Sequence, residues 1–210
     1  MKLAIFGAGG QGRETLMIAR QIARWTQIFF IDDVTEKKEI DGIAVQRLSE
    51  VCWEDCEVII ALGEPAHRER IATLFAFASF ATLIHPSAII AESAIIGAGT
   101  VVAKGAFISC DVIIGNNVLI QPDACLSHDV RIGDNSVISL KSALAGHCHV
   151  GKNAFLGMSC SVREKTTIGD DAIVGMGSIV VRDVSPATVV TGNPARFLHA
   201  NTRRRVFSHE

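Results

Sequence analysis

The chain has 210 residues, 49% of them hydrophobic and 20% charged, with a formal net charge of −2. This composition supports a packed core and excludes a wholly disordered chain, and the balanced charge argues against a nucleic-acid binder that works by bulk electrostatics. The sequence holds no apolar run of about 18 residues, and its amino end lacks the long apolar region of a secretory signal. We therefore expect a cytoplasmic protein with no membrane span, with six free cysteines rather than disulfides, and with no metal site.

The amino-terminal part of the chain predicts one half of a Rossmann sheet. The expected elements are, in chain order, a buried strand at 2–6, a glycine-rich stretch at 7–12, a helix at 13–24, a strand at 28–31 that ends at two aspartates, a strand at 58–62 that ends at a glycine, and a helix at about 65–75. Strand, glycine loop, helix, strand and acid in this order are typical of the mononucleotide-binding half of a Rossmann fold.

The glycine-rich stretch 7–12 lets backbone N–H groups approach a phosphate at the positive end of the following helix. Only about eighty residues precede the next pattern, so the second mononucleotide half is missing. A nucleoside diphosphate therefore fits better than a dinucleotide. The alternative at this point is a tight strand-to-helix turn that binds nothing.

A six-residue repeat occupies the middle of the chain. One aliphatic residue recurs at every sixth position from Ile84 to Val180, and the residue two positions earlier is usually small. Glycine recurs every eighteen residues, at Gly97, Gly115, Gly133, Gly151 and Gly169. Three hexads thus make one coil of a triangular prism of short parallel strands. We expect the aliphatic residues to point inward, the small ones (Cys148 and Cys160 among them) to share the interior, and the glycines to relieve the turns.

The hexapeptide pattern resembles that of left-handed β-helix acyltransferases. Along its whole length the chain is similar to bacterial sialic acid O-acetyltransferases and to N-acetyltransferases of nucleotide-linked 4-amino-sugars, which include the bacillosamine- and perosamine-pathway enzymes. The segments that carry the resemblance are the glycine stretch 7–12, Phe30-Ile31-Asp32-Asp33, Ile60-Ala61-Leu62-Gly63, Leu83-Ile84-His85-Pro86-Ser87-Ala88, Ser127-His128-Asp129-Val130-Arg131-Ile132-Gly133 and Gly192-Asn193-Pro194-Ala195-Arg196.

The resemblance implies an α/β Rossmann-like half-domain followed by an all-β, left-handed parallel β-helix. It implies a nucleotide-sugar-binding domain at 1–82, an acetyl-CoA-binding β-helix at 83–184 and a carboxyl-terminal extension at 185–210. The relatives form trimers with active sites in the grooves between prisms, and we expect a homotrimer here too. The outward aliphatic residues Ile95, Ile113 and Ile173 agree with this expectation, because large apolar patches rarely stay exposed.

By the same resemblance, His128 is the general base and Asp129 the acid that orients it. The repeat agrees with this placement, because His128 comes two residues after the inward Leu126 and so lies at an outward corner. Gly146 follows eighteen residues later, one coil or about 4.8 Å away, where its N–H can polarise a thioester carbonyl. His147 and His149 are interpreted as surface residues.

The resemblance also implies the ligand contacts. Acetyl-CoA is expected at Gly146, Gly157, Met158, Gly175, Met176, Pro194 and Arg196, and the nucleotide sugar at Gly9, Gly10, Gln11, Asp32, Asp33 and Gly63. Two positions depart from the family pattern: Gln11 stands where some relatives have a sugar-facing histidine, and Val137 stands where a histidine can line the acetyl-CoA site.

The predicted reaction is the transfer of acetyl from acetyl-CoA to the amino group of a nucleotide-linked sugar. One alternative keeps the chemistry and changes the acceptor to a hydroxyl, as in the O-acetylation of sialic acid. Another is a non-catalytic nucleotide-binding scaffold, against which the pair His128 and Asp129 argues. A third is an NAD-dependent oxidoreductase, against which the half-size sheet argues.

Overall fold

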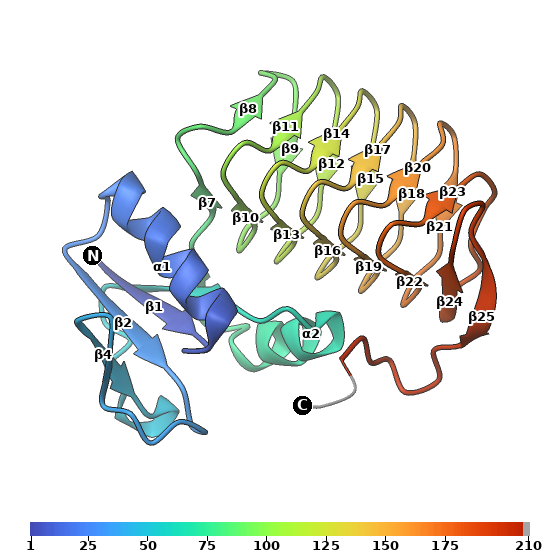
Figure 1. The fold of residues 1–210 in the computed structure, drawn as a ribbon. Helices are drawn as coiled ribbons and strands as arrows, with labels where there is room; N and C mark the ends of the chain where they lie inside the picture. Colours follow the sequence, from blue (N-terminus) through green and yellow to red (C-terminus); the bar gives the residue numbers. More distant parts are fainter. Residues whose placement is uncertain (208–210) are drawn as a thin grey trace.

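The amino-terminal elements form a mostly parallel sheet in the computed structural model, which describes residues 1–207 (Figure 1). The sheet has the order β3-β4-β2-β1-β5-β6, and only the short β3 runs antiparallel to its neighbour. The bounds are β1 Lys2–Phe6, α1 Gly10–Ile22, β2 Gln27–Ile31, β3 Glu39–Ile40, β4 Ile43–Gln46, a 3-10 turn Leu48–Glu50, β5 Cys56–Ile60, α2 Pro65–Leu74 and β6 Ser79–Phe80. The central strands are runs of buried aliphatic and aromatic residues, as a sheet covered on both faces requires.

The prism follows as seventeen two-residue strands over residues 83–180, arranged in three parallel sheets (Figure 1). Each strand pairs with the strand eighteen residues away, as Val101 does with Leu119. Sheet C contains β7 Leu83–Ile84, β10 Val101–Val102, β13 Leu119–Ile120, β16 Val137–Ile138, β19 Phe155–Leu156 and β22 Ile173–Val174. Sheet D contains β8 Ile89–Ile90, β11 Phe107–Ile108, β14 Cys125–Leu126, β17 Ala143–Leu144, β20 Ser161–Val162 and β23 Ile179–Val180. Sheet E contains β9 Ile95–Ile96, β12 Ile113–Ile114, β15 Arg131–Ile132, β18 His149–Val150 and β21 Thr167–Ile168.

The predicted fold class is confirmed: a Rossmann-like half-domain precedes a parallel β-helix. From Val102 onward the sixth-position aliphatic residues are all buried in the prism, together with Cys148 and Cys160. The role predicted for the repeated glycines is wrong. Their φ angles are not positive, and a Cβ on Gly97 would lie 2.4 Å from the carbonyl oxygen of Gly115. These glycines therefore allow the coils to stack closely.

The left-handed backbone of each turn falls instead on a second set of residues. Positive φ recurs at every sixth residue, for example 58° at Asp111, 54° at Asn117, 60° at Asp129 and 60° at His147. Asparagine, aspartate and histidine tolerate this conformation better than β-branched residues do. The turn geometry thus places Asp129 and His147 at equivalent corners of adjacent coils.

The amino-terminal domain covers the outer face of sheet C. Leu83, Val101 and Leu119 on this face join a buried cluster with Leu16 and Ile18 of α1. One of the aliphatic residues predicted to be exposed on the outside of the prism is in fact covered. Ile95 is 60% exposed, as predicted, but Ile173 is only 9% exposed. Ile173 belongs to sheet C, whose outer face lies beneath the amino-terminal domain and the carboxyl-terminal tail. It therefore contributes nothing to an exposed apolar patch.

The carboxyl-terminal tail returns from the end of the prism to the first domain. It follows the antiparallel hairpin of β24 Thr188–Thr191 and β25 Arg196–Ala200. Arg204 forms ion pairs with Glu69 of α2 and with Asp171 of the prism, both at 2.7 Å. The buried carboxylate of Glu64 accepts hydrogen bonds from the N–H groups of Val206 and Phe207. Within residues 1–207, neither helix has the length and apolar character that crossing a bilayer requires.

A buried arginine joins the two domains. Arg68 is fully buried, and its guanidinium donates to the carbonyl oxygens of Ile60 and Leu62 at 2.9 Å and to that of Asn117 in the prism at 2.8 Å. Burial lowers the pKa of Arg68 to about 9, so the side chain stays charged at neutral pH.

We expect Arg68→Ala to lower the free energy of unfolding by about 2 kcal/mol, because buried carbonyl groups lose their donors. Urea unfolding measures the change. Arg70→Ala is the matched control on the same helix; because Arg70 is exposed, we expect a change within about 0.5 kcal/mol. Equal stability of the two variants would contradict the assigned role of Arg68.

Candidate functional site

An acid–base pair lies at the prism corner between β14 and β15. His128 Nδ1 lies 2.8 Å from Asp129 Oδ2, and the side chains are 53% and 42% exposed. Because a carboxylate can only accept, Nδ1 carries the proton of the neutral imidazole and Nε2 is left free to take up another. The two residues predicted as the catalytic pair thus have the geometry of a general base and its orienting acid.

The electrostatic surroundings keep the acid ionised. The hydrogen bond from His128 is the main cause that lowers the pKa of Asp129. Burial opposes it, but the charges of His147, His128 and Arg131 add to the lowering, so the pKa lies below its usual value. Asp129 therefore carries its charge over the whole neutral range, where it stabilises a protonated His128.

Gly146 provides the space in which the His128 ring lies. A Cβ built on Gly146 would fall 2.5 Å from Cε1 and 2.6 Å from Nε2 of that ring. The two coils are held in this register by the hydrogen bond from the His147 N–H to the His128 carbonyl, at 3.0 Å. Among the described residues 1–207, the Gly146 N–H donates to no hydrogen-bond acceptor.

His147 belongs to this site, although from the sequence we expect only a surface residue there. Its Nε2 lies 3.7 Å from Asp129 Oδ2, and its ring meets that of His128 edge to face, with centroids 5.1 Å apart and an interplanar angle of 84°. The signal was present in the sequence: His147 follows Asp129 by eighteen residues, the same spacing that relates Gly146 to His128. His149 lies exposed on β18, as expected.

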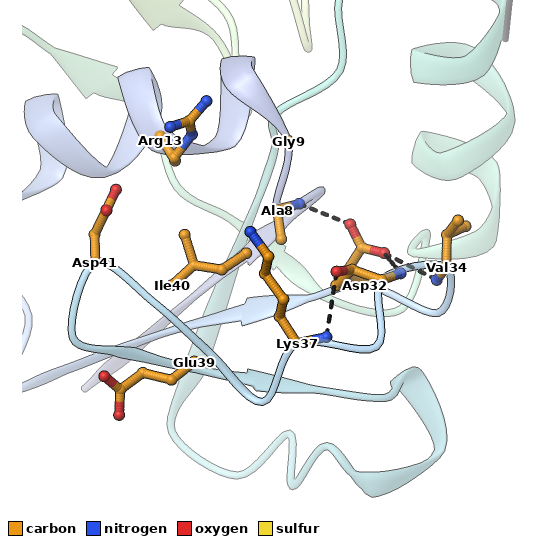
Figure 2. A pocket seen from close by; sticks show the side chains of 10 residues that line it. Ala8, Gly9, Arg13, Asp32, Val34, Lys37, Glu39, Ile40 and Asp41 are labelled. Carbon is orange, nitrogen blue, oxygen red and sulfur yellow. Dashed lines mark hydrogen bonds between the residues drawn. The ribbon is translucent and has the colours of Figure 1, made fainter.

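A second candidate site surrounds the glycine loop. A cavity of about 610 Å³ opens between the start of α1 and the chain after β2 (Figure 2). Its walls include Gly9 and Asp32, and Figure 2 shows the Lys37 side chain reaching toward the glycine loop from the opposite wall. The lining also contains two cations that were not predicted from the sequence, Arg13 and Lys37. Arg13 is recognisable from its place in the first turn of the helix, whereas nothing in the sequence singles out Lys37.

The four glycines of the loop divide into two kinds. Gly7 has a φ of 100°, and a Cβ on Gly12 would fall within 2.0 Å of the Gly7 carbonyl oxygen, so both are required by the fold. A Cβ on Gly9 or Gly10 would meet no atom within 4 Å. No side chain caps the start of α1 at Gly9. Open glycines and uncapped N–H groups at a helix start favour an anion-binding loop over an inert turn.

The two aspartates after β2 brace the loops around this cavity. Asp32 accepts hydrogen bonds from the N–H groups of Ala8, Val34 and Thr35, each at 2.9 Å. Burial raises the pKa of Asp32, but these bonds and the charge of Arg47 outweigh it, so the pKa of Asp32 lies below its usual value. Asp33 accepts from the Leu48 N–H at 2.9 Å. Asp32 thus acts on a ligand mainly through the loops it holds.

The remaining predicted nucleotide-sugar residues lie at the carboxyl edge of the sheet or face the prism. Gly63 follows β5, and a Cβ there would lie 3.5 Å from the Phe207 ring. Gln11 accepts a hydrogen bond from Gln121 of the prism at 3.2 Å, a partner that the sequence did not indicate. A further cavity of about 720 Å³ on the other side of Asp32 is lined by Gly7, His67 and Arg70 among others.

The predicted acetyl-CoA residues are not all brought to His128. Gly146 lies at the corner between sheets D and E, but Met158 and Met176 lie in turns that lead from sheet C to sheet D. Both methionines are exposed, 45% and 70%, beside Gly157 and Gly175, while Pro194 and Arg196 lie at the tip of the β24–β25 hairpin. Val137 is 1% exposed beneath the amino-terminal domain, so it lines no surface groove. Within one chain, sheet D separates the two groups.

We expect Asp32→Ala to weaken binding of a nucleotide sugar about tenfold and to leave acetyl-CoA binding nearly unchanged, because it releases the loops at Ala8 and Thr35. Gly9→Val should act in the same direction. A Cβ at Gly9 meets no atom within 4 Å, so we expect the loss to come from blocked approach of the ligand. Calorimetry with each ligand separates the effects. The exposed Glu36→Ala is the control, and equal weakening of both ligands would rule out two separate sites.

Comparison with known proteins agrees with this geometry. The family model "PglD N-terminal domain" matches residues 2–75, and "Bacterial transferase hexapeptide (six repeats)" matches residues 111–139 and 147–182. The acetyltransferase domain of PglB from Neisseria gonorrhoeae superposes with a TM-score of 0.91 at 29% identity, covering 94% of this chain and 99% of that chain. No curated protein sequence matches the chain significantly.

Two liganded structures are also similar. The PglB domain in complex with acetyl coenzyme A has a TM-score of 0.89 and 30% identity, over 94% of this chain and 98% of that chain. PerB from Caulobacter crescentus, in complex with CoA and GDP-perosamine, has a TM-score of 0.85 and 29% identity, over 95% of this chain and 98% of that chain. The amino-terminal domain and the prism are both shared along nearly the whole length. The chain therefore belongs to the hexapeptide-repeat acyltransferases that carry a PglD-type amino-terminal domain.

Proposed function

We propose that this enzyme transfers the acetyl group of acetyl-CoA to the amino group of a nucleotide-linked amino-sugar, in the cytoplasm. The observation that carries the proposal is the pair His128 and Asp129, hydrogen-bonded at 2.8 Å over Gly146 on a prism shared with sugar acetyltransferases. In this proposal residues 1–82 bind the nucleotide sugar, residues 83–184 bind acetyl-CoA, and 185–210 is the predicted extension, of which 208–210 lie outside the described residues.

The chemistry of the step matches the pair. An amine that attacks a thioester gains positive charge as the new C–N bond forms, so a base must remove its proton. His128 Nε2 takes that proton while Nδ1 stays bonded to Asp129, and the carboxylate stabilises the resulting imidazolium. The C–S bond then breaks, and the sulfur of CoA leaves with the proton that the imidazolium returns. The Gly146 N–H, which has no acceptor among residues 1–207, is suited to polarise the thioester carbonyl. Structures of perosamine N-acetyltransferase variants in which one histidine is replaced add support for a histidine base.

The glycine-loop cavity suits the diphosphate of the acceptor. Its lining combines Gly9, at the uncapped start of α1, with the cations Arg13 and Lys37. A helix start with free N–H groups attracts phosphate, and the nearby cations add to the attraction. The sugar would then extend from the loop toward Gln11 and the prism.

The oligomer is part of the proposal. His128 and Met158 lie at different corners of one prism, so a groove that contains both kinds of residue needs a second copy of the chain. The exposed Ile89 and Ile95 on sheets D and E, 63% and 60% exposed, provide apolar faces for that contact. In a ring of three copies around one axis, each chain uses its two faces to contact its two neighbours, so neither face stays exposed in the assembly.

We expect light scattering at micromolar concentration to give three times the chain mass of 22.5 kDa. Ile95→Lys should shift the population toward smaller species because it buries an unpaired charge in the contact. Thr167→Lys, at an exposed position on the last strand of the same sheet, is the control for added charge. A mass of 22.5 kDa for the unmodified protein would exclude the trimer.

The reaction itself is tested by release of free CoA from acetyl-CoA with a panel of acceptors. The panel contains UDP-, GDP- and dTDP-linked amino-sugars, their hydroxyl analogues and free sialic acid. We expect turnover only with an amino-sugar linked to one nucleotide. Turnover with sialic acid alone would overturn the N-acetyl assignment in favour of O-acetylation, and absence of turnover with the whole panel would contradict the proposed reaction.

A further inference from the structure

We propose that His128, Asp129 and His147 also form a binding site for a divalent cation of the zinc class, which silences the base when it is occupied. Three potential ligand atoms, one from each residue, lie within 4.8 Å of one another. The binding part of this proposal stands on the geometry alone. The inhibitory part rests on the proposed function, since it needs His128 to act as the base.

The distances between the donors suit one metal ion. The carboxylate Oδ2 of Asp129 lies 2.8 Å from His128 Nδ1 and 3.7 Å from His147 Nε2. Zinc binds such ligands at about 2.0–2.1 Å, which places neighbouring ligand atoms roughly 3.3 Å apart around a tetrahedron. The two separations from Asp129 bracket this value, and the two histidine nitrogens lie within 4.8 Å of each other, so rotation of the exposed side chains brings the three donors around one ion. All three side chains are between 42% and 53% exposed, which leaves the ion an entry path and a remaining position for water.

The coil geometry holds the donors together before any ion arrives. His147 is one coil beyond Asp129, and both have the same left-handed backbone, with φ of 60°. The hydrogen bond from the His147 N–H to the His128 carbonyl, at 3.0 Å, ties the two histidines to adjacent coils. The donor set of two imidazoles and one carboxylate suits zinc, cobalt(II), nickel(II) and copper(II), and does not suit magnesium or calcium, which prefer oxygen ligands.

Occupation of the site changes the proton on the base. A cation that binds His128 Nδ1 displaces the proton that this atom shares with Asp129. The single proton of the neutral ring then moves through solvent from Nδ1 to Nε2, the atom that must otherwise accept a proton from the attacking amine. The same ion is coordinated by the Asp129 carboxylate and neutralises its negative charge, which otherwise stabilises the imidazolium. The base is therefore blocked by coordination at its far nitrogen, with no need for the ion to enter the substrate groove.

His147 is what distinguishes this site from the catalytic pair. Without it, only the two adjacent donors remain, and two ligands hold zinc weakly at a solvent-exposed corner. His147→Asn removes a ligand and keeps a side chain of similar polarity and the pair His128–Asp129. His149→Asn is the matched control, because His149 is also an exposed histidine, two residues further on, and is outside the cluster.

The experiment titrates zinc chloride into the EDTA-treated full chain by calorimetry, with no substrate present. We expect a site of micromolar affinity in the unmodified protein and in His149→Asn, and at least about tenfold weaker binding in His147→Asn. Exposed thiols such as Cys52 and Cys110 bind zinc equally in all three proteins, so the difference between variants is the readout. Magnesium should give no such difference. Equal zinc affinity of the two variants would overturn the site.

The rate of acetyl transfer is then followed in the same proteins, each relative to its own zinc-free rate, by chromatography of the product. We expect half-inhibition at a zinc concentration equal to the calorimetric dissociation constant, and recovery of the rate when EDTA is added. In His147→Asn only, half-inhibition should require at least about tenfold more zinc. Full activity with the site saturated would overturn the blocked base. If the proposed reaction were wrong, no transfer would be observed, but the calorimetric difference between the variants would remain.

Discussion

Replacing His128 with alanine is expected to lower kcat by about 10²–10⁴-fold, the usual contribution of a general base, with little change in affinity for acetyl-CoA. The side chain is half exposed and makes its hydrogen bond to its neighbour Asp129, so its loss removes a proton acceptor and little of the packing. Steady-state kinetics at intervals from about pH 6 to about pH 9 measure the effect. His149→Ala, on β18, is the matched control and should retain the full rate.

The same kinetics distinguish direct transfer from an acetyl-enzyme. No Cys or Ser is assigned as a nucleophile, so both substrates must be bound together, and double-reciprocal plots should intersect rather than run parallel. Asp129→Asn should reduce kcat less than His128→Ala does. It should also move the acidic limb of the pH–rate profile to lower pH, because the carboxylate no longer stabilises the imidazolium. Parallel plots, or an unchanged kcat in His128→Ala throughout this range, would refute the assigned mechanism.

Gly146→Ala is expected to lower kcat about 100-fold without unfolding the prism. The new Cβ would lie 2.5 Å from Cε1 of His128, and both backbones are held by hydrogen bonds between coils, so the exposed ring must move. A displacement of about 1 Å is enough to cost this factor in rate. Because the ring has open solvent beside it, thermal unfolding should change by no more than the equivalent of about 0.5 kcal/mol.

A double variant separates displacement of the base from other effects of the added methyl group. In the His128→Ala background, Gly146→Ala has no ring to displace, so it should lower kcat by much less than it does alone. If the methyl group costs the same factor in both backgrounds, the loss comes from the Gly146 N–H or from the thioester, and the placement of the ring over Gly146 has no catalytic consequence. An unaffected kcat in the single variant Gly146→Ala would likewise show that the placement of the ring over Gly146 has no catalytic consequence.

Much of the fold is encoded locally. The six-residue spacing of aliphatic residues follows directly from two-residue strands with one inward side chain, so the prism and its buried face are readable from Ile84 to Val180. The loop between β1 and α1 is likewise readable, because closely spaced glycines between a buried strand and a helix have few other uses. The role of the repeated glycines is a harder case. A turn and a close approach between coils both favour glycine, and only the backbone angles tell them apart.

The site shows the same division. The repeat predicts that Gly146 lies beside His128, and the same arithmetic places His147 beside Asp129, where the structure finds it at 3.7 Å. No such rule relates Gln11 to Gln121, which are 110 residues apart and meet at 3.2 Å. Contacts of this kind depend on how one domain docks on the other, and docking leaves no periodic signal in the chain.

The sequence by itself determined the two architectures and the adjacency of His128 and Asp129, and it predicted a phosphate-binding type of loop. Each of these depends on residues close in the chain or related by a fixed repeat. The tertiary structure decided what depends on packing between distant segments. It showed that Ile173 is covered rather than exposed, that Arg68 joins the domains, and that His128 and Met158 lie at different corners of one prism. The physical reason is that a repeat specifies which residues are neighbours along a coil and between coils. Whether an outward residue is buried or exposed depends on which other domain or chain packs against that face of the prism.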